Sequence, residues 1–316
     1  MSAVVFAYHD VGCAGIRVLH RLKIPIAAVY THADDPHENT WFASVRRTCE
    51  ELKLEVHVGA DPNSESEREK IARLQPTAFF SFYYRDLLKR ALLELPKRGG
   101  VNLHGSLLPR YRGRAPVNWQ LLHGERESGA TLHYMVARAD AGDIVDQEPY
   151  SIGPDDTPGD VFKKLLPAAE RVLARSAPSV IDGSAPRIEQ MESKATTFGR
   201  RTPADGLIHW RMAAHDVRNL VRAVTEPYPG AFTFTGGGSK RRITVWWADF
   251  VADAPRTVKE PGTVEWSGPG AGDAPLVVCG DRRRLRLSKF AIDKGSDGAS
   301  DPRSLLKDGT VLGTGS

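Results

Sequence analysis

Cysteine and long apolar runs are both scarce in this chain of 316 residues. The cysteines are Cys13, Cys49 and Cys279, an odd number with wide spacing and no CxxC pair. This pattern argues against a disulfide framework and a cysteine zinc site, and it fits a reducing cytoplasm. No apolar run approaches the roughly 18 residues that a membrane-spanning helix needs. The first residues, MSAVVFAYHD, lack the basic segment of a secretory signal, so we expect a cytoplasmic protein with no membrane partner.

A large excess of one charge is also missing, because 43 lysines and arginines stand against 39 aspartates and glutamates, a net charge of +4. A nucleic-acid-binding protein usually gathers its positive charge on one face. The densest basic runs, at 240–242 and 282–286, fall late in the chain, in segments with a strand-like pattern. We interpret them as solvated strand faces, which argues against a nucleic-acid partner.

The glycine fingerprint of dinucleotide binding is absent. Gly12 and Gly15 follow the first expected strand as GxxG and not as GxGxxG. The second strand is not followed at the usual distance by a convincing acidic residue. We therefore expect neither NAD nor FAD, and the sequence offers no cluster of metal ligands.

The first 190 residues alternate between strand-like and helix-like segments. Short apolar runs typical of buried strands occur at 3–8, 24–30, 54–58, 78–82 and 100–104, and a further strand is expected at 129–136. Strands separated by helices imply parallel pairing with right-handed crossovers. The region is therefore predicted to be an open, Rossmann-like, mostly parallel α/β sheet with helices on both faces.

Polar residues mark the expected start of two helices. Thr40 can cap a helix that runs to about Leu52. The run Thr157-Pro158-Gly159-Asp160 resembles a capping box with proline at the first helical position. An apolar stripe follows this box, which predicts an amphipathic helix.

The pattern changes after about residue 190. A short helix is expected near 215–224, and the remaining strand-like runs are broken by clusters such as Pro261-Gly262 and Gly280-Asp281. Short strands with this spacing indicate a small β-barrel or sandwich. We therefore expect a catalytic domain at 1–190, a connector at 191–204 and a β-barrel-like, OB-like domain at 205–310.

The segment 102–116, NLHGSLLPRYRGRAP, concentrates polar residues at the end of the strand expected at 100–104. Ligands bind beyond the carboxyl ends of strands in open α/β sheets. Asn102 and His104 should point to the same face, because side chains alternate along a strand. An amide and an imidazole side by side can both hydrogen-bond to one developing oxyanion.

A second polar segment, RADAGDI at 138–144, follows the strand expected at 129–136. Either Asp140 or Asp143 can approach His104 if the two strand ends are neighbours. A nearby carboxylate favours the charged imidazole, which would make His104 a better general acid near neutral pH. His133, on the preceding strand, is interpreted as a buried, hydrogen-bonded histidine rather than a catalyst.

The ordered motifs Asn-x-His, Ser-Leu-Leu-Pro, Arg-Gly and Ala-Asp-Ala-Gly-Asp resemble those of the folate-dependent formyltransferase family. That family includes methionyl-tRNA, glycinamide-ribonucleotide and amino-sugar formyltransferases. The resemblance implies that Asn102 holds the oxyanion, that His104 donates a proton and that Asp140 raises the pKa of His104. It also implies 10-formyltetrahydrofolate as the formyl donor and co-substrate, with no metal.

Within the family, the chain is most similar to the UDP-4-amino-4-deoxy-L-arabinose formyltransferase domain of bifunctional polymyxin-resistance proteins. The matching segments are FAYHDVGCAGI at 6–16, SFYYRDLL at 81–88, NLHGSLLPRYRGRAPVNW at 102–119 and FGRRTPADG at 198–206. The likeness implies formylation of the 4-amino group of that nucleotide-linked sugar, a step of lipid A modification in polymyxin resistance. The decarboxylase half of those proteins has no counterpart in this sequence, so a separate decarboxylase is expected in the pathway.

The same resemblance implies which residues bind the two substrates. The folate is expected at Asp86, Leu87, Leu88 and Arg114 and along the segment Val136, Ala137, Arg138, Ala139 and Asp140. The family commonly carries histidine where Asp86 stands, a change without effect if the backbone makes the contact. The sugar nucleotide is expected at Tyr84, Arg85, Arg200 and Arg201, the last two on the connector, where arginines can bind a diphosphate bidentately.

Two alternative substrates remain open. A methionyl-tRNA formyltransferase would share the catalytic residues and a β-barrel domain. Another UDP- or dTDP-linked amino sugar would use the same site. The modest net charge gives tRNA weak support, and tRNA binding would weaken steeply with salt because phosphate contacts release counterions.

Overall fold

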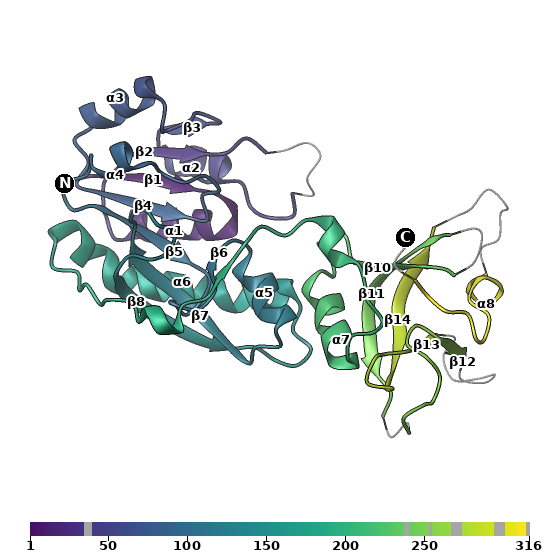
Figure 1. Ribbon diagram of the computed structural model, residues 1–316. Coiled ribbons are helices and arrows are strands. Elements are labelled where there is room, and N and C mark those ends of the chain that lie inside the picture. Colours follow the sequence, from purple (N-terminus) through teal and green to yellow (C-terminus); the bar gives the residue numbers. More distant parts are fainter. Residues whose placement is uncertain (35–39, 237–239, 253–254, 267–273, 294–300, 314–316) are drawn as a thin grey trace. The chain divides into compact units, whose positions relative to one another are not determined.

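The chain forms two compact units in a computed structural model, which describes residues 1–34, 40–236, 240–252, 255–266, 274–293 and 301–313. The first unit contains residues 1–116, 126–152 and 161–200. The second contains residues 117–125, 153–160 and 201–316 (Figure 1). Two short stretches from the N-terminal part of the chain therefore belong to the second unit.

A seven-stranded sheet with the order β3-β2-β1-β4-β5-β7-β8 forms the centre of the first unit (Figure 1). Five strands are parallel: β1 (Ala3–Ala7), β2 (Ile26–Thr31), β3 (Val56–Val58), β4 (Ala78–Phe82) and β5 (Gly100–His104). At one edge, β7 (Glu127–Tyr134) and β8 (Ile144–Ser151) add antiparallel strands. Every residue of β1 and β4 is buried, as their apolar runs predict. The expected Rossmann-like, mostly parallel sheet is confirmed.

Helices cover both faces of this sheet. They are α1 (His9–Arg21), α2 (Val45–Leu52), α3 (Glu65–Arg73), α4 (Arg90–Leu93), α5 (Pro116–Leu122) and α6 (Pro158–Asp182), of which α5 and the start of α6 extend into the second unit. On one face, Phe6 of β1 packs with Ile71 of α3 and Leu92 of α4. On the other face α1 packs so closely that a β-carbon at Gly12 would lie 3.1 Å from the β-carbon of Ala7.

The cap of α2 differs from the expected one. The helix begins at Val45, and Ser44 caps it by accepting a hydrogen bond from the Arg47 amide through Oγ at 3.4 Å. The expected cap at Thr40 is wrong. Serine is as good a cap as threonine, and Ser44 stands three residues before the amide that needs an acceptor.

The capping box expected at the start of α6 is present. The Thr157 amide donates to the Asp160 carboxylate at 3.2 Å, and the Asp160 amide donates to Thr157 Oγ1 at 3.4 Å. Each side chain therefore satisfies a backbone amide that the first helical turn leaves without a partner.

The second unit is a small antiparallel β domain. Its strands are β10 (Ala231–Phe234), β11 (Arg242–Phe250), β12 (Val264–Trp266), β13 (Pro275–Val278) and β14 (Arg284–Ile292), in the order β10-β11-β14-β13-β12. Two further helices, α7 (Ala214–Ala223) and α8 (Pro302–Leu305), accompany them. The last described segment bridges both edges of the sheet, because Gly313 pairs with Phe234 and Val311 pairs with Thr263. These bridges close the sheet into the expected small barrel.

A two-stranded parallel ladder lies outside the main sheet. It pairs β6 (Arg112–Gly113) with β9 (Thr197–Phe198). A short 3-10 helix, η1 (Glu192–Lys194), precedes β9, and another, η2 (Pro203–Gly206), follows it. The ladder fixes the loop after β5 against a segment far away in the sequence.

The three cysteines are free and buried. Burial raises the pKa of Cys49 and of Cys279 to about 12, so both thiols stay protonated near neutral pH. None of the helices in the described parts of the chain combines the length and the apolar character that crossing a bilayer requires.

Candidate active site

The three residues expected to be catalytic come together at β5. Asn102 and His104 lie two positions apart on β5. Asp140 places Oδ2 at 3.7 Å from His104 Nδ1 and Oδ1 at 3.4 Å from Asn102 Nδ2. The other candidate, Asp143, faces Arg187 at 3.8 Å instead.

Asp140 reaches this cluster by a route that the strand pattern does not predict. Because β7 runs antiparallel to β5, its last residue, Tyr134, lies beside Val101 near the start of β5, so the two strand ends are not neighbours. The chain after β7 folds back in a turn that closes when the Tyr134 amide donates to the Asp143 carbonyl at 2.8 Å. A β-carbon at Gly142 would lie 2.0 Å from the Tyr134 carbonyl oxygen, so this turn requires glycine.

The carboxylate of Asp140 is almost buried and is surrounded by positive charge and donors. Its side chain is 13% exposed. Burial alone would raise its pKa, but the charges of His104 and His133, a hydrogen bond with His133 and the donated amide of Gly113 outweigh this effect. The pKa of Asp140 is therefore far below its ordinary value, and the group is a stable anion. The Gly113 amide donates to Oδ2 at 2.8 Å.

Both ring nitrogens of His104 have defined neighbours. Nε2 lies 2.7 Å from the carbonyl oxygen of Tyr111. Because a carbonyl only accepts, Nε2 carries a hydrogen. Nδ1 faces the Asp140 carboxylate at 3.7 Å, so a second proton on the ring would lie against an anion. The ring is thus oriented by the loop after β5 and by the turn after β7.

His133 is buried and hydrogen-bonded, as its sequence position suggested, yet it also touches the cluster. Its Nδ1 lies 2.9 Å from the Tyr134 carbonyl, so Nδ1 carries a hydrogen. Its Nε2 lies 3.1 Å from Asn102 Nδ2 and 3.4 Å from Asp140 Oδ1. The amide nitrogen of Asn102 therefore lies within hydrogen-bonding distance of both His133 and Asp140, and the longer contact, at 3.4 Å to Asp140, is the weaker of the two.

The loop after β4 carries the first group of expected folate residues. Leu88 is buried in the core, so it can offer only its backbone. The Asp86 carboxylate lies 3.9 Å from His32 Nδ1. Burial lowers the pKa of His32, Asp86 opposes this shift, and the charges of Arg85 and Arg114 add to it. Arg114, from the loop after β5, therefore acts electrostatically on His32, whose Nε2 accepts a hydrogen bond from the Arg85 amide of this loop.

Apolar side chains are exposed in both expected folate segments. Leu87 is 69% exposed and Val136 is 47% exposed. In the same segment as Val136, Arg138 pairs with Glu192 at 2.7 Å. Exposed aliphatic groups in both segments can pack against the flat ring of a ligand.

The expected sugar residues Tyr84 and Arg85 are held against β1 and β2. The Tyr84 ring stacks on His32, with 4.1 Å between centroids. The Arg85 guanidinium lies 4.5 Å from the centre of the Tyr8 ring, and its backbone amide donates to His32 Nε2 at 3.0 Å. These contacts fix the direction of the loop.

The two connector arginines fall in different units. Arg200 ends the first unit, and Arg201 begins the last segment of the second. The Arg201 guanidinium lies 4.8 Å from the centre of the Trp119 ring, and Nη2 donates to the Asp205 carbonyl at 2.9 Å. Their role in binding a diphosphate stays a prediction.

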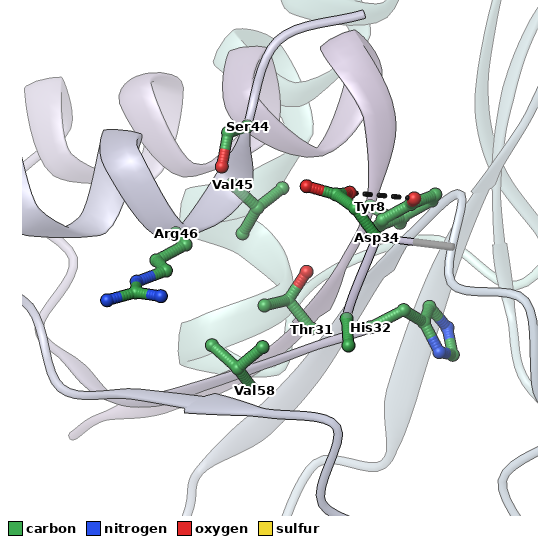
Figure 2. Close-up of a pocket in the computed structure, with 9 residues that line it drawn as sticks. Tyr8, Thr31, His32, Asp34, Ser44, Val45, Arg46 and Val58 are labelled. Atoms are coloured by element: carbon green, nitrogen blue, oxygen red, sulfur yellow. Dashed lines mark hydrogen bonds between the residues drawn. The ribbon is translucent and has the colours of Figure 1, made fainter. Parts of the chain in front are cut away.

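A cavity of about 170 Å³ lies at the ends of β1, β2 and β3. Figure 2 shows Thr31, Val45 and Val58 around the same space, and the ring of His32 pointing away from it. Its lining is Tyr8, Thr31, His32, Ala33, Asp34, Ser44, Val45, Arg46 and Val58. Tyr8 donates to Asp34 at 3.0 Å, so these two polar groups satisfy each other. The cavity contains none of the residues expected to be catalytic.

Four further residues contact the cluster, and the sequence does not predict these contacts. These are Tyr111, Gly113, His133 and Gln190, whose Nε2 donates to the Asp140 carbonyl at 2.8 Å. The only local signal for Gly113 is its place between two arginines in the Arg-Gly motif. Nothing local distinguishes Gln190, which lies 50 positions after Asp140.

Comparison with known proteins identifies the family of this chain. The sequence model of the family described as formyl transferase matches residues 10–176, and that of the formyl transferase C-terminal domain matches residues 200–297. The chain belongs to the formyl transferase family. The cluster of Asn102, His104 and Asp140 lies within the matched N-terminal part.

Solved formyltransferases share the fold. WlaRD, a sugar 3N-formyl transferase studied with dTDP and 5-N-formyl-THF, matches with a TM-score of 0.66 and 17% identity over 92% of this chain and 98% of its own. The N-formyltransferase of Helicobacter canadensis, in complex with folinic acid and dTDP-3-aminofucose, gives 0.67 and 18%, over 91% and 98%. The methionyl-tRNA formyltransferase of Clostridium thermocellum gives 0.52 and 16%, over 80% and 95%.

Proposed function

We propose that this formyl transferase uses 10-formyltetrahydrofolate to formylate the amino group of a nucleotide-linked sugar. The expected sugar is UDP-4-amino-4-deoxy-L-arabinose, as in the lipid A modification of polymyxin resistance. The observation that carries the proposal is the cluster of Asn102, His104 and Asp140, with Asp140 ionised and 3.7 Å from the His104 ring. The two solved sugar formyltransferases support the substrate class.

The residues expected to bind the folate have side chains that suit it. Leu87 and Val136 expose aliphatic surface in the two segments expected to hold it. Arg114 adds a positive charge that acts on His32, the neighbour of Asp86, and positive charge suits an anionic ligand. When bound, the folate would supply an activated formyl group, and its nitrogen would take up a proton as the bond to the formyl carbon breaks.

The cluster can stabilise charge and supply that proton. As the sugar amine attacks, negative charge develops on the formyl oxygen, and preorganised donors stabilise it best where water is excluded. Asn102 can contribute by exchanging its long contact with Asp140 for the oxygen, while its contact with His133 holds the amide in place. Protonated His104 can donate a hydrogen bond through Nε2, in exchange for its contact with the Tyr111 carbonyl, and then a proton to the folate nitrogen as its bond to the formyl carbon breaks. The proton that the attacking amine loses restores the ring, and Asp140 keeps a negative charge beside it.

A substrate panel tests the proposal. The wild-type protein and 10-formyltetrahydrofolate are incubated with UDP-4-amino-4-deoxy-L-arabinose, dTDP-3-aminofucose, free 4-amino-4-deoxy-arabinose and methionyl-tRNA, and product mass is measured. We expect formylation of the UDP sugar and poor use of the free sugar, because binding energy from remote groups positions the reacting amine. Preferred formylation of tRNA, or none of any amine, would refute the proposal.

The connector arginines are tested by binding. We expect Arg200→Ala/Arg201→Ala to weaken binding of UDP while the affinity for a folate analogue is unchanged, because guanidinium groups recognise phosphates. Calorimetric titrations with each ligand measure this, and Arg73→Ala, a 75% exposed arginine on α3, is the control. Unchanged UDP affinity, or equal weakening of both ligands, would remove these arginines from the site.

A further inference from the structure

The backbone of Asp140 has an unusual conformation. Its φ is 53°, in the left-handed region that non-glycine residues adopt rarely, although aspartate does so more often than most. The carboxylate has to reach His104, Asn102 and the Gly113 amide at once. Its position therefore depends on contacts that hold this backbone conformation.

Gln190 supplies such contacts from a distant part of the chain. Its Nε2 donates to the Asp140 carbonyl at 2.8 Å and to the Gly142 carbonyl at 2.7 Å. These carbonyls lie on either side of the bend at 140–142, so one amide group bridges the turn. Gln190 is itself buried, with 7% of its surface exposed.

Arg112 determines which way the Gln190 amide faces. Its Nε and Nη2 donate to Gln190 Oε1 at 3.0 and 2.8 Å. A guanidinium only donates and a carbonyl only accepts, so the oxygen must face Arg112 and the nitrogen must face the turn. Arg112 is 1% exposed and cannot exchange this partner for water.

The same two-residue strand thus acts on Asp140 from two sides. Through its side chain, Arg112 of β6 orients Gln190, which holds the backbone of the turn. Through its amide, Gly113 of β6 holds the carboxylate of Asp140 at 2.8 Å. The ladder between β6 and β9 keeps this strand in place.

We propose that Gln190 is a positioning residue for formyl transfer: it holds the turn at 140–142 so that the Asp140 carboxylate faces His104. The expected effect on catalysis rests on the proposed function. The effect of the Gln190 amide on the position of Asp140 does not depend on which reaction the protein catalyses.

Gln190→Glu separates positioning from packing. The glutamate keeps the size of the side chain and can still accept from Arg112, but it has no donor for the two turn carbonyls. We expect kcat for the amino sugar to fall about 10- to 100-fold, because small displacements of catalytic groups cost this much. KM for the sugar nucleotide should stay within about threefold, since Gln190 is not expected to contact it. Gln75→Glu, the same change at an exposed position, should leave kcat unchanged.

Hydrogen exchange of the Gly113 amide gives a second readout, which needs no substrate. In the wild type this amide donates to Asp140, so its exchange is slowed. We expect NMR to show at least about tenfold faster exchange in Gln190→Glu and no change in Gln75→Glu. This readout distinguishes the two proposals: failure to formylate any sugar refutes the function, whereas unchanged exchange refutes the positioning role.

A third variant removes the effect of the added charge. Gln190→Met has neither donor nor charge, so loss of positioning should again speed Gly113 exchange and lower kcat. If Gln190→Met folds and keeps wild-type exchange and kcat, the effect of Gln190→Glu is due to charge and the proposal is wrong. If Gln190→Met does not fold, the folded Gln190→Glu decides the question by the two readouts above.

Discussion

His104 is oriented at both ring nitrogens by groups from different segments. Nε2 is held by the Tyr111 carbonyl, and Nδ1 faces Asp140. A glutamine at position 104 can replace the hydrogen bond that His104 makes to the Tyr111 carbonyl. It cannot replace a histidine that also releases a proton. This difference makes a conservative substitution informative.

We expect His104→Gln to lower kcat by roughly 10²–10⁴ while the protein stays folded, because glutamine can donate to the Tyr111 carbonyl but cannot act as an acid. Steady-state kinetics and circular dichroism measure the two effects. His20→Gln, at an exposed position on α1, is the matched control. A folded His104→Gln protein with wild-type kcat would exclude His104 as the proton donor.

Asp140 links the site to stability at low pH. Its pKa is lowered in the folded protein, so it contributes stability above its ordinary value of 3.8, and that contribution is lost as pH falls toward the folded value. We therefore expect Asp140→Asn to be less stable than the wild type at pH 5–7, and the difference to shrink below about pH 4.

Urea unfolding followed by far-ultraviolet circular dichroism, at several pH values, measures this difference. Asp216→Asn serves as the control, since that carboxylate is 57% exposed on α7. A difference between wild type and Asp140→Asn that is equally large at pH 3 and pH 6 would show that ionisation of Asp140 is not the cause.

The turn after β7 determines which of two aspartates, Asp140 or Asp143, lies beside His104. An antiparallel β7 would carry the chain away from His104 if it continued straight. The tight turn returns it, so that Asp140 meets His104 and Asp143 meets Arg187. The turn is close-packed against its own strand at Gly142.

We expect Gly142→Ala to lower both kcat and the free energy of unfolding, the latter by more than about 1 kcal/mol, because the added carbon would meet the Tyr134 carbonyl at 2.0 Å. Gly199→Ala is the control, since a β-carbon there would have no atom within 4 Å. Urea unfolding and kinetics on the two variants measure the effects. Equal behaviour would mean that the turn can relax without moving Asp140.

The two units of the molecule are not two continuous segments of the chain. The second unit combines three separate stretches, and one guanidinium joins them. Arg222, 3% exposed, donates to the carbonyls of Leu121, Gly153 and Asp156 at 3.2–3.3 Å and to Asn219 Oδ1 at 2.9 Å. The boundary expected between 1–190 and 205–310 leaves 117–125 and 153–160 out of the second unit, and we propose that these stretches stabilise it.

We expect Arg222→Met to destabilise the second unit by at least about 2 kcal/mol, because several buried acceptors lose their donor at once. Tryptophan fluorescence in urea reports mainly this unit, since five of the six tryptophans belong to it: Trp119, Trp210, Trp246, Trp247 and Trp266. Arg211→Met, at an exposed position, is the control. An unchanged unfolding midpoint would show that the three stretches do not depend on Arg222.

By itself, the sequence determined the elements whose cause is local. Continuous apolar runs such as 78–82 had to be buried strands, since both faces are apolar. The box at Thr157 had to begin a helix, because the groups that satisfy each other are three residues apart. The alternation of side chains along a strand, which is also a local property, placed Asn102 and His104 on one face.

The strand pattern left Asp140 and Asp143 open, and only the tertiary structure shows how Asp140, the residue that the family resemblance names, reaches His104. It alone also decided the contacts of His133 and Gln190. Each depends on the direction of β7, on the turn that follows it and on a segment 50 positions further along the chain. A single polar residue in a loop has no local pattern, because its hydrogen-bond partners are defined only when distant segments pack together. The positions around the reacting groups are therefore products of long-range packing, whereas the strand that carries Asn102 and His104 is encoded locally.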